Sequence, residues 1–129
     1  MKDTLLVIED NEQNFYLMRF LLEKNGFAVI GAGTGRQGIE MALRHRPKAI
    51  LLDIQLPEMD GYAVARELKK HTEMTGTPII AVTSYAMAGD REQILAAGAT
   101  GYIEKPIDPD TFVSDIINFF PQEGEGRES

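Results

Sequence analysis

Near the middle of the chain, residues 49–53 read Ala49-Ile50-Leu51-Leu52-Asp53, an apolar run that ends on a carboxylate. Further apolar runs bounded by turn residues occur at residues 5–8, 27–30, 79–82 and, more weakly, 100–103. Near-continuous apolar runs are typical of strands that are buried on both faces, as in a parallel sheet. The sequence therefore predicts five buried strands.

Each run is followed by a segment with helical spacing. After the first run, Phe15, Met18 and Leu22 share one face, and Asn25-Gly26 is a typical helix end. The later helices are expected at about 36–44, from about 60 onward, at about 90–97 and at 109–120. Strands that alternate with helices predict a doubly wound α/β domain, and right-handed crossovers leave few possible topologies.

Composition narrows the function classes. The 129 residues include no cysteine, which excludes disulfides, thiolate metal sites and thiol nucleophiles. The net charge of −7 argues against a broad basic surface that would bind nucleic acid. No apolar run approaches the roughly 18 residues of a membrane span. We expect a cytoplasmic protein with one domain over residues 1–121. Residues 122–129, which contain no apolar residue, are expected to be a disordered acidic tail or a linker stub.

Polar residues follow the strands where each one ends. Glu9-Asp10 follows the first run, Asp53 the third, Thr83-Ser84 the fourth and Glu104-Lys105-Pro106 the fifth. In a sheet of order 2-1-3-4-5, the topological switch point lies between the first and third strands, and ligands bind outside the carboxyl ends there. Glu9, Asp10 and Asp53 should therefore lie side by side.

The negative charges of such a carboxylate cluster must be compensated. Two unit charges about 4 Å apart repel by about 4 kcal/mol at an effective dielectric constant near 20, so a raised pKa or a cation is required. Mg²⁺ suits an oxygen donor set and leaves positions for phosphate oxygens. Lys105 and the Thr83 hydroxyl, on the far side of the same crevice, would neutralise phosphoryl oxygens in an in-line transfer. Asp53 ends the central strand and is the candidate attacking group.

Each of these residues also has a purely structural interpretation. Asp10 or Asn11 would serve equally as a helix cap, and Asp53 would suit a turn ahead of Pro57. Thr83 is compatible with a simple strand-end hydroxyl, and Lys105 with a solvated lysine. These interpretations leave open why all the polar groups fall at strand carboxyl ends, which favours a functional site.

The sequence resembles the receiver domains of bacterial two-component response regulators, from Lys2 to about Phe120. The matching segments are Val7-Ile8-Glu9-Asp10-Asn11, Leu51-Leu52-Asp53-Ile54-Gln55-Leu56-Pro57-Glu58-Met59-Asp60-Gly61, Ile80-Ala81-Val82-Thr83-Ser84, Ala96-Ala97-Gly98-Ala99 and Gly101-Tyr102-Ile103-Glu104-Lys105-Pro106-Ile107. The resemblance implies a flavodoxin-like fold, with a doubly wound five-stranded parallel sheet of order 2-1-3-4-5 and five helices.

The resemblance implies that Asp53 accepts a phosphoryl group from a phosphohistidine on a sensor histidine kinase or a histidine phosphotransfer protein. Glu9, Asp10, Asp53 and the backbone carbonyl of Gln55 would hold Mg²⁺. Thr83 and Lys105 would contact the phosphoryl group. Signalling would then proceed through a downstream protein target or an output domain.

The resemblance also implies a switch. The Thr83 hydroxyl would move toward the phosphoryl group, the aromatic ring of Tyr102 would turn inward, and a cis peptide bond would precede Pro106. Gln55 and Tyr85 occupy the positions that flank the hydrolytic water in receivers, and we predict slow self-hydrolysis because Tyr85 is bulky.

On the first predicted helix, Tyr16 and Phe20 lie opposite the core face centred on Met18. Aromatic residues are enriched in the cores of interfaces, so we interpret this pair as part of the docking surface for the kinase or phosphotransfer protein. Isolated exposed aromatics are also common and need have no such role.

Two other functions compete with a phosphorylated switch. A Mg²⁺-dependent aspartyl-phosphate phosphatase would use a second titratable residue two positions after the nucleophile, where this chain has Gln55. A flavin-binding domain of the same topology would need amides and hydroxyls after the first strand, where Glu9-Asp10 would repel a phosphate. We therefore expect a signalling phosphoacceptor and not an enzyme, with the Mg²⁺-dependent aspartyl-phosphate phosphatase or a phosphorylation-independent binding module as the alternatives.

Overall fold

Parallel pairing of buried strands organises the chain, as described by a computed structural model for residues 2–57, 59–84 and 87–121. One five-stranded sheet has the order β2-β1-β3-β4-β5, and every pairing is parallel. The strands are β1 (Thr4–Ile8), β2 (Ala28–Ala32), β3 (Ala49–Asp53), β4 (Ile79–Thr83) and β5 (Gly101–Glu104). The predicted fold class and strand order are confirmed.

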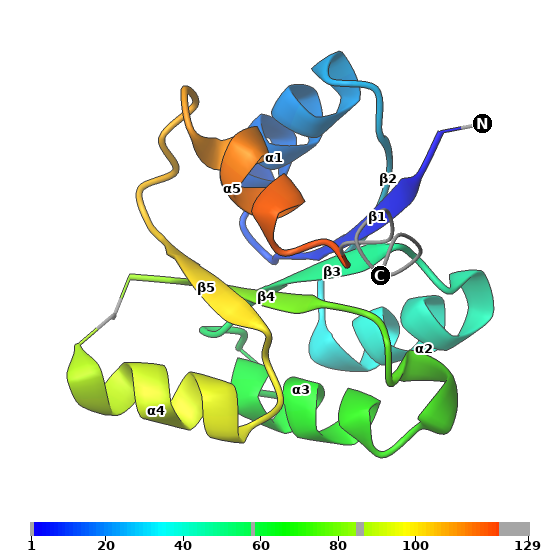
Figure 1. The fold of residues 1–129 in the computed structure, drawn as a ribbon, viewed down its shortest axis with the longest axis vertical. Helices are drawn as coiled ribbons and strands as arrows, with labels where there is room; N and C mark the ends of the chain where they lie inside the picture. Colours follow the sequence, from blue (N-terminus) through cyan, green and yellow to red (C-terminus); the bar gives the residue numbers. More distant parts are fainter. Residues whose placement is uncertain (1, 58, 85–86, 122–129) are drawn as a thin grey trace, which may run out of the picture.

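Helices cover both faces of this sheet (Figure 1). They are α1 (Glu12–Lys24), α2 (Gly35–His45), α3 (Gly61–Lys69), α4 (Ala88–Ala96) and α5 (Phe112–Asn118), with a short 3-10 helix, η1, at Thr72–Met74. One face packs against α1 and α5, and the other packs against α2, α3 and α4 (Figure 1). None of the described helices combines the length and apolar character needed to cross a membrane.

The two apolar layers explain the near-continuous hydrophobic runs. Alternate residues of β3 point to opposite faces: Ile50 and Leu52 pack with the layer of α2, α3 and α4, whereas Leu51 packs with α1 and α5. All residues of β3 and β4 are buried. A strand buried on both sides leaves only its ends available for polar groups, which is why the site lies at the carboxyl ends of the strands.

Local capping sets where helices begin. The Thr34 hydroxyl accepts a hydrogen bond from the Gln37 N–H at 3.1 Å at the start of α2, and an Asp60 carboxylate oxygen accepts one from the Ala63 N–H at 2.8 Å at the start of α3. These bonds satisfy N–H groups that have no partner within the helix.

The predicted last helix, 109–120, is shorter in the structure. A carboxylate oxygen of Asp108 accepts a hydrogen bond from the Asp110 N–H at 2.9 Å, and residues 109–111 form a turn before α5 begins at Phe112. Such local bonds between an Asp side chain and the backbone are typical of turns and of helix starts. The other helix bounds lie within about two residues of the predicted ones. The predicted tail, 122–129, lies outside the described residues.

Candidate functional site

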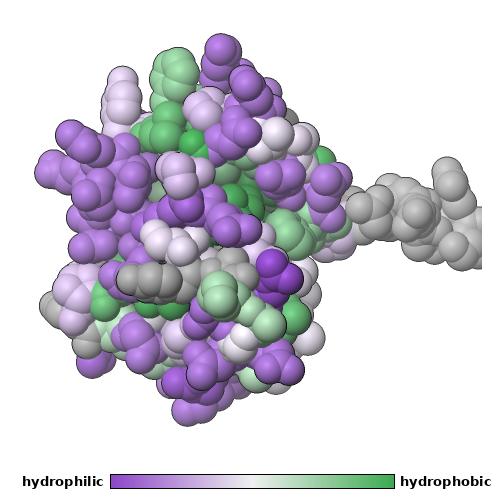
Figure 2. Space-filling view, turned by 90° about the vertical axis from the view of Figure 1, so that its left-hand side faces the viewer, coloured by the Kyte–Doolittle hydropathy of each residue, from purple (hydrophilic) through white to green (hydrophobic). Residues whose placement is uncertain are grey.

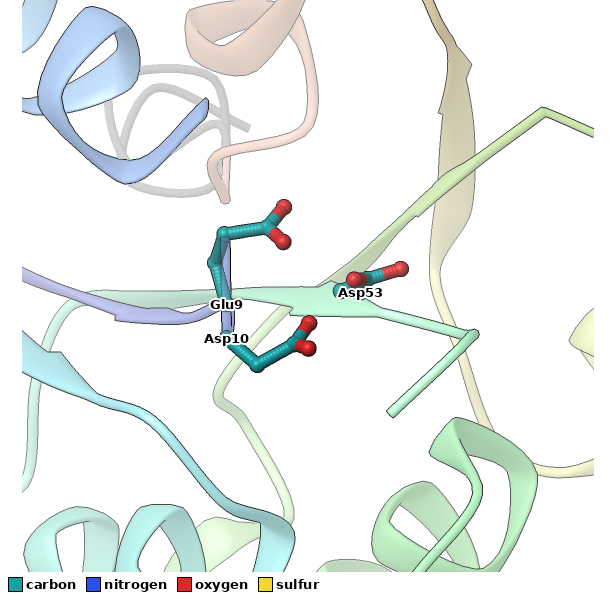
Figure 3. Close-up of side chains that lie close together, drawn as sticks. All are labelled: Glu9, Asp10 and Asp53. Atoms are coloured by element: carbon teal, nitrogen blue, oxygen red, sulfur yellow. The ribbon is translucent and has the colours of Figure 1, made fainter. Parts of the chain in front are cut away.

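Three carboxylates meet where β1 and β3 end. Ile8 pairs with Leu52 in the parallel register, so Glu9 and Asp10 emerge from β1 beside Asp53 at the end of β3. Figure 3 shows the three side chains converging from the two neighbouring strands, and each offers an oxygen within 4.8 Å of the others. The predicted convergence of these carboxylates is confirmed.

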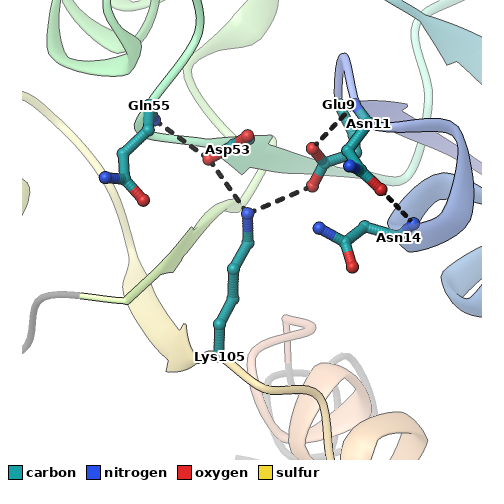
Figure 4. Close-up of polar contacts among 6 residues, drawn as sticks. All are labelled: Glu9, Asn11, Asn14, Asp53, Gln55 and Lys105. Carbon is teal, nitrogen blue, oxygen red and sulfur yellow. Dashed lines mark hydrogen bonds and ion pairs between the residues drawn. The ribbon is translucent and has the colours of Figure 1, made fainter.

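Asn11, and not Asp10, caps α1. The Asn11 side-chain oxygen accepts a hydrogen bond from the Asn14 N–H at 2.9 Å, while its own N–H donates to Glu9 Oε2 at 3.1 Å (Figure 4). The capping alternative for Asp10 is therefore wrong. The Asp10 side chain belongs to the exposed part of the carboxylate cluster, whereas Glu9 and Asp53 are buried, at 4% and 3% exposure.

Lys105 lies between the two buried carboxylates. Its Nζ atom is 3.4 Å from Glu9 Oε1 and 3.4 Å from Asp53 Oδ1, and only 16% of its side chain is exposed (Figure 4). The Lys105 N–H donates to the Thr83 carbonyl at 2.8 Å, which fixes the loop after β5 against β4. The Lys105–Pro106 peptide bond is cis, as the resemblance implies. The alternative of a solvated Lys105 is wrong.

The environment of Glu9 favours a proton or a cation. Burial, the close approach of the Asp53 carboxyl group and its negative charge together raise the pKa of Glu9 from 4.5 to about 7, against the opposing effects of the Asn11 N–H and Lys105. Glu9 Oε1 is buried, and among the described residues it accepts no hydrogen bond. Carboxylate oxygens with unused acceptor capacity are the hard donors that Mg²⁺ prefers, so this donor set fits the ion.

The segment after β3 holds Asp53 from the other side. Asp53 Oδ1 accepts a hydrogen bond from the Gln55 N–H at 2.9 Å, and the Gly61 N–H donates to the Ile54 carbonyl at 2.9 Å. A Cβ atom on Gly61 would lie 2.5 Å from Ile54 Cα and 2.8 Å from the Asp53 carbonyl oxygen. Gly61 therefore lets the backbone of the loop approach the end of β3 closely.

Thr83 and Tyr102 face the same side of the sheet. Ala81 pairs with Tyr102 in the register of β4 and β5, and Thr83 is two residues further along β4, where side chains point the same way. Thr83 is buried at 1% exposure and Tyr102 is half-buried. Above Tyr102 lies Arg91 of α4, a neighbour that no sequence signal indicated.

The predicted surface pair on α1 is exposed. Tyr16 is 69% and Phe20 is 51% exposed, while Met18, between them in sequence, is buried.

Figure 2 shows the side of the molecule that lies at the left in Figure 1, where hydrophilic residues predominate around a few apolar ones. Tyr85, predicted to affect phosphoryl lifetime, lies outside the described residues.

The sequence matches the family described as response regulator receiver domain over residues 5–117. It is 41% identical over 119 residues to the polar-differentiation response regulator DivK of Brucella anthropi, which covers 92% of this chain and 97% of that protein.

Among solved structures, the chain is similar to the receiver domain of the sensor histidine kinase PA1611 from Pseudomonas aeruginosa, which has a magnesium ion coordinated in its active site cleft. That match has a TM-score of 0.85 and 34% identity, and covers 92% of this chain and 98% of the other. The chemotaxis protein CheY4 of Vibrio cholerae matches with a TM-score of 0.89 over 93% of this chain and all of that one, and at 23% identity this likeness concerns the fold alone.

Proposed function

The chain belongs to the family of response regulator receiver domains, and on that premise we propose that Asp53 accepts a phosphoryl group from a phosphohistidine donor. The donor would be a sensor histidine kinase or a histidine phosphotransfer protein. The observation that carries this proposal is a buried Asp53 with two carboxylates and the Lys105 ammonium gathered around it. Phosphorylation would change the conformation that a downstream target protein or output domain recognises.

In the proposed reaction, a carboxylate oxygen of Asp53 attacks phosphorus in line with the P–N bond of the phosphohistidine. The new P–O bond forms as the P–N bond breaks, and the imidazole leaves with the bonding electron pair and takes up a proton from solvent. Charge is spread over the equatorial phosphoryl oxygens, so positioning and electrostatic stabilisation dominate catalysis. The Lys105 ammonium, 3.4 Å from Asp53 Oδ1, and the Thr83 hydroxyl would bind those oxygens.

We assign Mg²⁺ to Glu9, Asp10, Asp53 and the backbone carbonyl of Gln55. When bound, the ion would neutralise negative charge on the phosphoryl oxygens and on the attacking carboxylate. The carboxylate cluster and the unused acceptor capacity of Glu9 Oε1 support this assignment. The magnesium ion in the active site cleft of the PA1611 receiver domain supports it as well.

The proposed switch couples Thr83 to Tyr102, with Pro106 holding the loop that carries Lys105. Movement of the Thr83 hydroxyl toward a phosphoryl group would open space on the face of the sheet that Tyr102 shares with it, and the ring of Tyr102 would turn inward. The common orientation of these side chains on neighbouring strands supports this coupling. Gln55 and Tyr85 would set the lifetime of the phosphoryl group.

Members of this family act as signalling phosphoacceptors. We propose the same limited chemistry here: the chain would catalyse its own phosphorylation and dephosphorylation without turning over external phosphate esters. A phosphatase of this kind needs a general acid and base two positions after the nucleophile. Gln55 stands there, and it cannot serve in that role because its amide does not titrate. A cytoplasmic location and docking of the donor on Tyr16 and Phe20 of α1 complete the proposal.

The decisive experiment measures the intact mass of the protein after incubation with Mg²⁺ and acetyl phosphate. Wild type should gain one phosphoryl adduct, and Asp53→Asn should gain none. A chelator should prevent the adduct without unfolding the protein. An adduct of equal yield on Asp53→Asn would overturn the assignment of Asp53. Folded wild type that gains none while still binding Mg²⁺ would favour a phosphorylation-independent binding module.

A further inference from the structure

An arginine of α4 covers the ring of the proposed switch residue. The guanidinium carbon of Arg91 lies 5.6 Å from the centroid of the Tyr102 ring, within the range of a cation–π contact. Arg91 is itself exposed, in the first half of α4, which follows the loop after Thr83. The contact therefore joins a helix and a strand that both extend from the site.

Tyr102 occupies a boundary position. On one side it packs against the buried layer beneath α4, and on the other it lines a surface cavity of about 530 Å³ together with Leu95 and Phe119. From this half-buried position the Tyr102 ring can turn either inward, toward Thr83, or outward, toward the solvent. The Arg91 contact belongs to the arrangement seen here, and an inward turn of the ring would break it.

We propose that Arg91 is a positioning residue that opposes the switch: it holds the Tyr102 ring in the position that the ring has when Asp53 is unphosphorylated. This inference rests on the proposed function, because it concerns the step that would follow phosphorylation of Asp53. A contact made in only one of two conformations shifts their equilibrium by its own free energy. By reciprocity, Arg91 must then weaken the binding of any ligand that favours the inward ring.

The expected effect follows from the size of the contact. An exposed cation–π pair is worth about a two- to fivefold change in an equilibrium constant. Arg91→Ala should therefore tighten the binding of the phosphoryl mimic beryllofluoride, in the presence of Mg²⁺, by about two- to fivefold. Arg91→Lys, which keeps a cation, should change the affinity less than Arg91→Ala does.

The test is a double-mutant cycle in which isothermal titration calorimetry measures beryllofluoride affinity. The background Tyr102→Leu removes the ring, and there Arg91→Ala should have no effect. The background Tyr102→Phe keeps the ring and should retain the effect, which keeps the cycle informative if Tyr102→Leu does not fold. Arg36→Ala, which removes an exposed arginine from α2, is the matched control and should bind like wild type.

The inference is overturned if Arg91→Ala leaves the affinity unchanged or weakens it, or if its effect persists without the aromatic ring. If the wild-type protein binds no beryllofluoride and gains no phosphoryl adduct, the proposed function is overturned, and the inference with it. If the wild-type protein does both but the cycle shows no coupling between Arg91 and Tyr102, only the role of Arg91 is overturned. The two failures are thus distinguishable.

Discussion

Lys105 and Asp53 form a largely buried ion pair, with Nζ 3.4 Å from Oδ1, and the same ammonium lies 3.4 Å from Glu9. Removing one member of a buried ion pair leaves uncompensated charge, which costs more than the pair contributes. Lys105→Met should therefore lower the free energy of unfolding of the metal-free protein by about 1–3 kcal/mol, measured by urea denaturation at pH 8 with a chelator present.

Mg²⁺ should recover most of that loss, because a divalent cation replaces the missing positive charge among the carboxylates. Lys70→Met is the matched control: Lys70 pairs with Glu67 on the surface, its side chain is 72% exposed, and its loss should be small with or without Mg²⁺. A loss for Lys105→Met that is the same in chelator and in Mg²⁺ would contradict this electrostatic account.

The pKa of Glu9 gives stability a pH dependence of known sign. Glu9 has a pKa of about 7 in the folded protein, against 4.5 without the surrounding structure, so the folded state binds its proton more tightly. Its contribution to stability is therefore complete below about pH 4.5 and is lost as pH rises through 7. In metal-free protein this loss should amount to about 2–3 kcal/mol between pH 5 and pH 8.

Urea denaturation of wild type and Glu9→Gln across this range isolates the contribution of Glu9 to the pH dependence of stability. The difference in free energy of unfolding between the two proteins should change with pH in the chelator series. Because Mg²⁺ competes with the proton, wild type should also bind Mg²⁺ more weakly at pH 6 than at pH 8. A difference that is flat with pH would argue against a raised pKa for Glu9.

The arrangement of the fold could be predicted because its determinants are local or topological. Runs such as 49–53 identify buried strands, and parallel pairing then leaves their polar ends at one edge, where Glu9 and Asp53 meet. The start of α5 could not be predicted from helical spacing, because residues 109–111 form a turn in which the Asp108 side chain accepts a hydrogen bond from the Asp110 N–H. Spacing alone does not distinguish such a turn from the first turn of the helix.

Within the site, the sequence predicts which residues gather but not how they pair. The choice of Asn11 over Asp10 as cap depends on where the backbone turns into α1, which begins at Glu12. The position of Lys105 between Glu9 and Asp53 depends on the path of the loop after β5. The contact of Arg91 with Tyr102 joins elements that no periodicity relates. Such contacts are set by tertiary packing.

Gly61 tests how closely the loop after β3 must approach the phosphoacceptor. A methyl group at this position would lie 2.5 Å from the Cα atom of Ile54, so the backbone next to Asp53 must shift. Gly61→Ala should lower the free energy of unfolding by about 1–3 kcal/mol and weaken Mg²⁺ binding. Gly33→Ala, whose Cβ meets nothing within 4 Å, is the control and should be close to neutral in both. Equal behaviour of the two variants would show that the loop adapts without strain.

The α1 surface formed by Tyr16 and Phe20 should affect transfer from a protein donor alone. Exposed aromatic residues that anchor an interface contribute more binding free energy than the interface residues around them. Truncating one at a hot spot costs about 2 kcal/mol or more of binding free energy. Tyr16→Ala combined with Phe20→Ala should therefore slow phosphoryl transfer from a phosphorylated histidine phosphotransfer protein by at least about tenfold. Acetyl phosphate is too small to need a docking surface on α1, so the rate of phosphorylation by this donor should stay close to the wild-type value. Leu95→Ala, which removes a side chain of similar exposure, 52% against 51% for Phe20, from α4, controls for loss of apolar surface in general. If the double variant slows both donors equally, these aromatics support the site or the fold, and the docking surface lies elsewhere.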